Sequence, residues 1–278
     1  MPSVDLAARG RVPAPVRLLR AGATLLIFAS GLVAHRGIEA QSDTVLRAPL
    51  LTVGERLEYE VRFGPLKVGR ASMEVMGVEE VRGRRTWHTR FQVTGGTLFF
   101  RVNDVLESWI DMETFSSLRF RQQLSEGSSD RLYEYEIYPE RATYIQKGKE
   151  EKPSVSRPLD DGSFLYFLRT IQLELGATYE FSRYFMPDRN PVRLDVLGRD
   201  TVDVPAGRFD ALVIRPVIKA KGVFSEDGRA QVWLSNDADH VLLQMTSHLK
   251  IGSINLHLKS RTVRDTSSAA SSDSTRSP

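Results

Sequence analysis

Apolar and polar residues alternate along much of the first half of the chain, between residues 50 and 147. In the first such segment Leu57, Tyr59, Val61 and Phe63 are separated by charged residues. The same alternation recurs at 71–75, 87–93, 118–124 and 132–138. A period of two predicts strands with one buried and one solvated face, the pattern of an antiparallel sheet.

One segment has a different period. Between residues 161 and 173, four apolar residues recur at three- and four-residue spacing: Phe164, Phe167, Leu168 and Ile171. This spacing predicts a helix with one apolar face. Asp161 or Ser163 can cap its start, and Gly176 follows its end.

Further strand-like segments follow this helix, at 179–185, 192–197, 201–204, 210–219, 229–234, 241–249 and 253–260. Turns rich in Gly, Pro, Asn and Asp separate them. We therefore predict one mainly β domain over residues 50–264, a single antiparallel curved sheet or barrel-like domain of roughly a dozen strands with one central helix at about 161–173. The helix divides it into halves at 50–147 and 177–262, and the segment 149–158 links the first half to the helix.

The first forty residues have the pattern of an export signal. Four arginines between positions 9 and 20 precede the uncharged apolar stretch 21–34. That stretch is 14 residues long, shorter than the roughly 20 residues that a membrane-spanning helix needs. We expect a signal peptide over residues 1–40, with cleavage after Ala40 or, alternatively, after Ala34 or Gly31, and no membrane span afterwards. An uncleaved anchor is the alternative.

These features predict an exported protein, periplasmic or associated with the outer envelope of a Gram-negative-type bacterium. No cysteine follows the apolar stretch, so the protein is not expected to be a lipoprotein. Residues 41–49 form a short extension. The Ser-rich tail, residues 265–278, lacks large apolar residues and is expected to be disordered.

Removal of the signal changes the charge of the chain. Residues 1–40 hold five of the 38 Lys and Arg residues and two of the 35 Asp and Glu residues, which leaves 33 of each. A nucleic-acid partner is not expected, because binding to phosphates depends on a basic surface. The sequence has no cysteine, which excludes disulfides, thiolate catalysis and Cys-ligated metals.

Three groups of residues resemble a family of exported bacterial proteins known as domain of unknown function 3108. They lie in a first hairpin, in the predicted helix and in the second half of the chain: 54–59, 68–71, 160–169, 204–209, 232–237 and 251–253. The combination is more specific than any one of them. The resemblance implies a β-rich envelope protein, and it supplies no catalytic residues.

Recognisable catalytic and metal motifs are missing. The GxSxG elbow and both glycine-rich nucleotide loops are absent, and no cofactor is expected. His248 and His257 could meet across a hairpin that turns at Gly252, which leaves a metal pair as the alternative to ordinary cross-strand histidines. Three polar groups are better explained by turns and helix capping than by hydrolase, calcium or acid-base chemistry: 128–130, 236–239 and 160–161.

The chain is rich in aromatic residues, which either fill the core or line an apolar cavity between the sheet and the helix. The candidate ligand-lining residues are Phe164, Phe167 and Leu168 on the helix, with Trp109 and Trp233 on strands. We expect a non-enzymatic envelope protein that binds a lipophilic small molecule or an envelope component. The alternatives are a structural or assembly module that binds a protein partner through a sheet edge, and an unrecognised hydrolase.

Overall fold

The computed structural model describes residues 51–96, 101–218, 230–249 and 252–264. These residues form one compact unit. The predicted signal peptide (1–40), the extension (41–49) and the tail (265–278) lie outside the described residues.

Within the described residues the chain forms fourteen strands and one α-helix. The first eight strands are β1 (Glu55–Phe63), β2 (Leu66–Val81), β3 (Arg84–Gly96), β4 (Arg101–Asp111), β5 (Ser117–Glu126), β6 (Ser129–Tyr138), β7 (Thr143–Gln146) and β8 (Glu151–Pro153). The helix α1 spans Asp161–Phe167. The remaining strands are β9 (Thr178–Phe181), β10 (Val192–Val204), β11 (Gly207–Val217), β12 (Gln231–Ser235), β13 (Leu242–Leu249) and β14 (Gly252–Val263). Two short 3-10 helices lie at Pro139–Arg141 and Pro187–Arg189.

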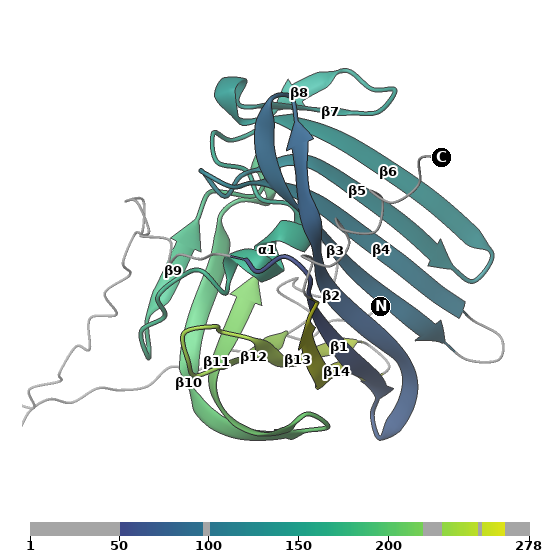
Figure 1. Cartoon of the computed structure of the whole chain (residues 1–278), viewed down its shortest axis with the longest axis vertical. Coiled ribbons are helices and arrows are strands. Elements are labelled where there is room, and N and C mark those ends of the chain that lie inside the picture. The colour runs from purple at the N-terminus through teal and green to yellow at the C-terminus, as the bar shows by residue number, and fades with distance from the viewer. Residues whose placement is uncertain (1–50, 97–100, 219–229, 250–251, 265–278) are drawn as a thin grey trace, which may run out of the picture. The chain divides into compact units, whose positions relative to one another are not determined.

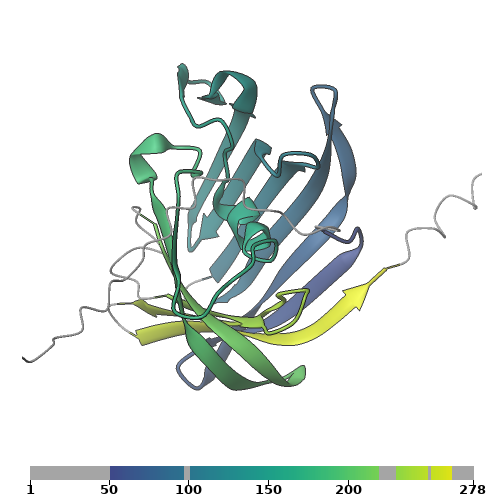
Figure 2. The same cartoon turned by 90° about the vertical axis from the view of Figure 1, so that its left-hand side faces the viewer.

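The strands form one antiparallel sheet, in the order β8-β7-β6-β5-β4-β3-β2-β1-β14-β13-β12-β11-β10-β9. The pairing of β1 with β14 joins the two halves of the chain at the centre of the sheet. The sheet curves around α1, which lies against its concave side (Figures 1 and 2). The mainly β fold with one curved antiparallel sheet and a central helix is therefore confirmed.

The two ends of the sheet come together without pairing strand to strand within the described residues. The segments that follow the end strands β8 and β9 meet at Leu159 and Tyr184. There the Leu159 amide donates to the carbonyl of Arg183 at 2.6 Å, and the Phe185 amide donates to the carbonyl of Leu159 at 2.9 Å. The sheet is an open curved sheet whose ends are held by this short contact.

The alternation in the sequence corresponds to the two faces of the sheet. Leu57, Tyr59 and Val61 are buried on the inner, concave face, where they belong to the main hydrophobic cluster. The intervening Glu58 and Glu60 are only partly buried. The inner face is therefore the apolar face of the sheet, and the outer, convex face is polar.

The helix is shorter than its periodicity predicts, ending at Phe167 instead of near residue 173. The next turn tightens, because the amides of Arg169 and Thr170 donate to the carbonyls of Tyr166 and Phe167, three residues back. Ile171 is still buried in the main cluster. The apolar spacing thus marked the buried side chains correctly, although the backbone leaves the α-helical path early.

Two strand boundaries also differ from the predicted ones. The segments 192–197 and 201–204 form one strand, β10. A bulge between Val196 and Gly198 shifts the strand register where the alternation of apolar and polar residues is interrupted. The predicted linker 149–158 contains the short edge strand β8. The described residues include no helix with the length and hydropathy needed to cross a membrane.

Candidate functional site

The three candidate residues on α1 lie in the interior of the structure. The exposed fractions of Phe164, Phe167 and Leu168 are 1%, 0% and 1%. A side chain that lined a cavity large enough for a ligand would keep accessible surface. Phe167 instead packs edge-on against Phe181, with ring centroids 5.3 Å apart. These residues therefore fill the core.

The two candidate tryptophans are engaged elsewhere. Trp109 belongs to a small separate cluster with Val81 and Leu118, and its indole nitrogen donates to Glu79 at 2.7 Å. The indole nitrogen of Trp233 donates to Asp200 of β10 at 3.0 Å. The five candidate residues thus do not line one common cavity in the described structure, and ligand binding by them stays a prediction.

A different apolar surface emerges from the strand register. Residues that pair across an antiparallel sheet point to the same face. One cross-strand row on the inner face runs through Val75, Thr89, Ser108, Phe120 and Tyr135. All five are buried, and the row lies where α1 contacts β3 and β4.

The neighbouring row is half-buried over β3–β6. It runs from Met73 through Phe91, Leu106 and Gln122 to Tyr133. From Phe91 onward the side chains of this row are partly exposed. We name Phe91, Val93, Leu106 and Tyr133 the inner apolar patch, because these half-buried side chains pack on the edge of the main hydrophobic cluster.

The inner apolar patch begins where α1 begins. Gly162, in the first turn of α1, is so close to β4 that a Cβ atom there would lie 2.6 Å from Ser108 Oγ and 3.6 Å from Leu106 Cβ. A larger residue at position 162 would push α1 away from the sheet. The start of α1 therefore lies against Ser108 of the covered row and beside Leu106 of the inner apolar patch.

A buried carboxylate holds the start of α1. Asp160 Oδ1 accepts hydrogen bonds from the amides of Gly162 and Ser163, both at 2.8 Å, and from Ser108 Oγ at 2.6 Å. The Asp160 amide in turn donates a hydrogen bond to the Ser163 hydroxyl, which completes a capping box. Burial raises the pKa of Asp160 to about 6, although the bonds from Ser108 and Ser117 oppose that effect.

A buried ion pair fixes the chain after α1. The two outer nitrogens of the Arg169 guanidinium donate to the two oxygens of Glu55, at 2.6 and 3.1 Å. Arg261 of β14 reaches the same carboxylate at 2.9 Å. Because Glu55 lies on the inner face of β1, this cluster attaches the helix segment to the centre of the sheet.

The outer face carries charges that alternate in sign from strand to strand. This outer charge ladder runs from β1 to the end of β7 through Arg56, Glu74, Arg90, Glu107, Arg121, Glu134 and Lys147. At its centre Glu107 binds Arg90 and Arg121, both at 2.8 Å. The contact with His88, followed by these arginines, holds the pKa of Glu107 well below its usual range against the opposing effect of burial.

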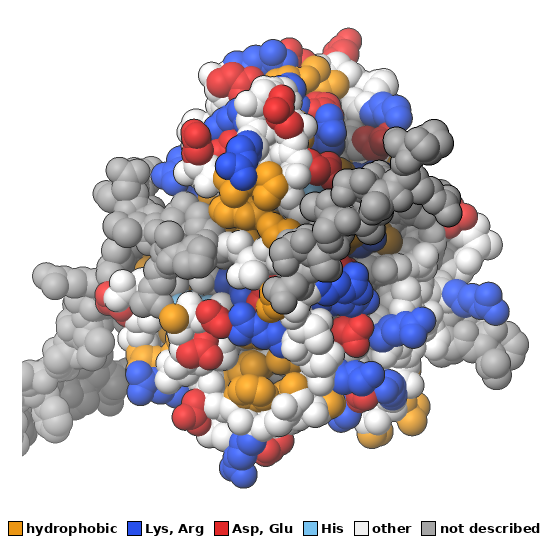
Figure 3. Space-filling view, viewed as in Figure 1, with side chains coloured by type: hydrophobic (Ala, Val, Ile, Leu, Met, Phe, Trp, Pro, Cys, Tyr) orange, Lys and Arg blue, Asp and Glu red, His pale blue; other side chains and the backbone are white. Residues whose placement is uncertain are grey.

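Acidic and basic side chains are interspersed on the molecular face drawn in Figure 3. An outer depression of about 460 Å³ lies beside Trp109, and its charged groups are paired. Arg119 binds Glu136 at 2.6 Å and Lys147 binds Glu134 at 2.5 Å. The outer charges in this region neutralise one another.

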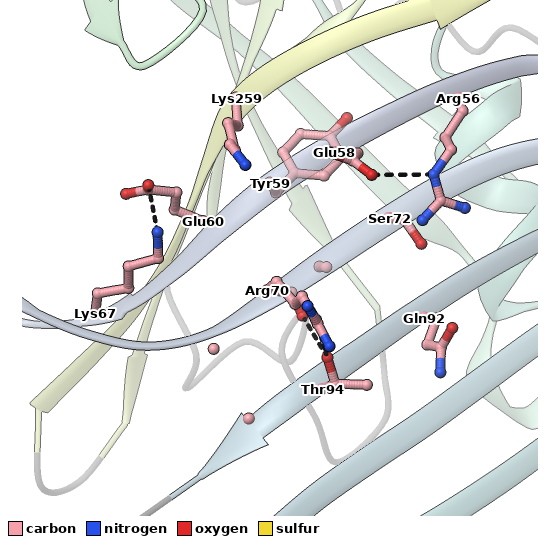
Figure 4. A pocket seen from close by; sticks show the side chains of 13 residues that line it. Arg56, Glu58, Tyr59, Glu60, Lys67, Arg70, Ser72, Gln92, Thr94 and Lys259 are labelled. Atoms are coloured by element: carbon pink, nitrogen blue, oxygen red, sulfur yellow. Dashed lines mark hydrogen bonds and ion pairs between the residues drawn. The ribbon is translucent and has the colours of Figure 1, made fainter.

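A groove of about 710 Å³ crosses β14, β1, β2 and β3 on the outer face (Figure 4). Six charged side chains line it: Arg56, Glu58, Glu60, Lys67, Arg70 and Lys259. Neutral polar side chains line it as well, from Ser72, Gln92 and Thr94. We call this the outer groove. No motif in the sequence marks it, because its residues come together only through the pairing of four strands.

The remaining predicted groups are structural. Asp237 Oδ1 accepts from the amides of Asp239 and His240 and from the Ser235 hydroxyl, which makes the 236–239 segment a turn. His248 pairs in register with Ser253 and His257 with Gln244, so the two histidines are not cross-strand partners. The described residues contain no group of three or more His, Asp or Glu side chains placed to hold a metal ion.

The family model described as "Protein of unknown function (DUF3108)" matches residues 58–259. A search of curated proteins found no match. Among solved structures, a β-barrel-like protein of domain of unknown function DUF1849 from Brucella abortus is 11% identical, with coverage of 77% of this chain and 99% of that chain and a TM-score of 0.45. A lipoprotein candidate from Parabacteroides distasonis is also 11% identical, with coverage of 76% and 96% and a TM-score of 0.31.

An exported-protein candidate with a YmcC-like fold from Bacteroides fragilis is 9% identical, with coverage of 76% of this chain and 96% of that chain and a TM-score of 0.29. All three TM-scores are low, so nothing about the function of this chain follows from them.

Proposed function

The chain belongs to the family of proteins of unknown function described as DUF3108, and because that description assigns no activity, we propose from the inner face that this protein binds a lipophilic molecule without catalysing a reaction. The binding surface is the inner apolar patch: Phe91, Val93, Leu106 and Tyr133. The observation that carries the proposal is the contrast between two neighbouring rows of the sheet. One row is fully covered beside α1, and the next keeps apolar side chains half-exposed.

The chemistry of the inner apolar patch suits an acyl chain or a similar apolar group. Covering half-exposed aromatic and aliphatic side chains is favourable by about 25 cal/mol per Å² of apolar surface removed from water. Gln122 and the hydroxyl of Tyr133 lie in the same row and supply a few polar groups. Apolar surfaces with a small number of polar groups are typical of small-molecule sites.

Binding of a protein partner through a sheet edge receives less support. The end strands β8 and β9 have three and four residues. The chain beyond each of them is already bonded at the contact between Leu159 and Tyr184. Such short end strands offer little backbone for the addition of another strand.

A hydrolase is also less well supported. The buried hydroxyls of Ser108, Ser117 and Ser163 cluster around Asp160, but all four side chains are fully inaccessible. A nucleophile must be reached by its substrate. Their hydrogen bonds hold the first turn of α1 against the sheet, so the cluster has a structural role.

The proposal includes export to the envelope. It rests on the basic and apolar pattern of residues 1–40. In that compartment a carrier or sensor of lipids would meet its ligand directly.

Uptake of the neutral fluorophore N-phenyl-1-naphthylamine by the purified protein tests the proposed site. We expect a saturable rise in fluorescence, and Leu106→Asn should weaken the affinity about fivefold or more, because the variant removes apolar contact area. Val105→Asn is the matched control, since Val105 is half-buried on the outer face of the same strand. Absence of saturable uptake, or equal weakening in both folded variants, would contradict the proposal.

A further inference from the structure

We propose that the outer groove is a second binding site, separate from the inner apolar patch, and that it takes a phosphorylated, hydroxyl-rich group such as a sugar phosphate or the head group of an anionic lipid. Two regions of the outer face differ in how their charges are paired. In the outer charge ladder and beside Trp109, cations stand next to carboxylates that neutralise them. In the outer groove, which Arg56 of the ladder also lines, the cations outnumber the carboxylates.

The outer groove has a surplus of positive charge. The lining residues are four cations and two carboxylates, a net charge of +2, and Arg56 is also bound by Glu74 beside the groove. Arg56 pairs with Glu58 at 3.2 Å and Lys67 with Glu60 at 2.6 Å. Within the described residues, Arg70 and Lys259 make no ion pair in this groove; the guanidinium of Arg70 reaches only the Thr94 hydroxyl, at 3.4 Å.

The cations and their neighbours match a phosphate. The fork of an arginine can bind two phosphate oxygens, and a lysine can add a point charge. Figure 4 shows the Arg70 side chain of β2 beside Thr94 of β3. Gln92 lies two residues before Thr94 on β3, and Lys259 lies across the groove. The anion would replace the long contact of Arg70 with Thr94 by stronger, charge-assisted bonds.

The carboxylates and neutral groups argue for hydroxyls on the same ligand. Hydrogen bonds with Arg56 and Lys67 lower the pKa values of Glu58 and Glu60, so both are ionised at neutral pH. They would repel a plain polyanion such as nucleic acid, but they can accept hydrogen bonds from hydroxyls. Ser72, Gln92 and Thr94 offer further donors and acceptors. A volume of about 710 Å³ is in the range of known small-molecule sites.

Titration calorimetry with five probes tests the proposal: glucose 6-phosphate, glucose, inorganic phosphate, phosphatidylcholine vesicles, and phosphatidylcholine vesicles that also contain phosphatidylglycerol. We expect glucose 6-phosphate, or the phosphatidylglycerol vesicles if the natural source is a lipid, to bind at least about tenfold tighter than glucose or inorganic phosphate. Binding should weaken with added salt, because Lys67, Arg70 and Lys259 are exposed.

The double variant Arg70→Gln, Lys259→Gln should reduce this affinity about tenfold or more. The matched control is Arg208→Gln, Lys152→Gln, which removes the same charge from exposed positions outside the groove. An equal loss in both double variants, or no binding of either phosphorylated probe, would overturn the proposal. Uptake of the naphthylamine should persist in the groove variant, so failure of this site is distinguishable from failure of the inner one.

Discussion

The two faces of this sheet are built from the same strands and differ in how their side chains are satisfied. On the inner face, contacts come from elements far apart in sequence, since α1 and the segment after it cover the strands and bury even their charged groups. On the outer face, charged residues pair mainly with their strand neighbours, and most of them remain partly in water, although Glu107 is buried. Substitutions on the inner face should therefore cost much more stability than similar ones on the outer face.

The largest contrast is expected for apolar side chains. Phe167→Ala should lower the free energy of unfolding by about 3–5 kcal/mol, because the ring is fully buried and leaves a cavity. Leu132→Ala on the outer face of β6, where the side chain is 51% exposed, should stay within about 0.5 kcal/mol. Urea unfolding measures both. A cost below about 1 kcal/mol for Phe167→Ala would show that α1 is loosely packed.

The loss of an ion pair should likewise cost more stability when the pair is buried on the inner face than when it lies on the surface. Glu55→Gln leaves Arg169 buried without its carboxylate, and we expect a loss of about 3–5 kcal/mol. Glu151→Gln removes a surface partner of Arg141, and its effect should be too small to measure. Similar unfolding midpoints for the two variants would contradict the structural role of the buried pair.

The pH dependence of stability also distinguishes the two faces, because each carries a buried carboxylate and the pKa values of these two are shifted in opposite directions. Because folding raises the pKa of Asp160, its protonated form favours the folded state. This contribution to the free energy of unfolding, about 3 kcal/mol, is fully present below about pH 4 and is lost as the pH rises through about 6. The lowered pKa of Glu107 gives a contribution that is present above its usual pKa and is lost on acidification.

Urea unfolding at several pH values separates these two effects. Asp160→Asn should flatten the decline between about pH 4 and 6, and Glu107→Gln should flatten the loss at lower pH. An unchanged profile in Asp160→Asn would show that this carboxylate is not held in a dry environment.

The smallest contrast concerns two glycines. Gly162→Ala should cost about 1–3 kcal/mol, because the new methyl group would collide with Ser108 Oγ. Gly77→Ala in β2 should be close to neutral, since no atom lies within 4 Å of the added Cβ. Thermal unfolding compares them, and the account of how α1 docks would be wrong if Gly162→Ala were as stable as Gly77→Ala.

Much of the fold could be predicted from local patterns. Alternation at Leu57, Tyr59 and Val61 identified the inner face, and the spacing of Phe164 and Phe167 identified the buried face of α1. The early end of α1 was not predictable, because it depends on tightened backbone bonds and on the reach of Arg169 to Glu55, 114 positions away.

The candidate sites were less accessible to sequence reasoning. The aromatic residues suggested a cavity lined by Trp109 and Phe164, but an aromatic side chain alone does not reveal whether it fills a core or borders a cavity. Phe91, Leu106 and Tyr133 form one row only through the register of β3–β6. The outer groove depends in the same way on four paired strands.

The most direct test of ligand binding is to purify the protein from its own cells, extract it with organic solvent and analyse the extract by mass spectrometry. We expect a lipophilic species in near-stoichiometric amount from the wild type and from the outer-face control Leu132→Ser. The inner-face variant Tyr133→Ser should release much less. No lipophilic species from the folded wild type, together with no uptake of the naphthylamine, would contradict the proposal that this protein binds a lipophilic molecule.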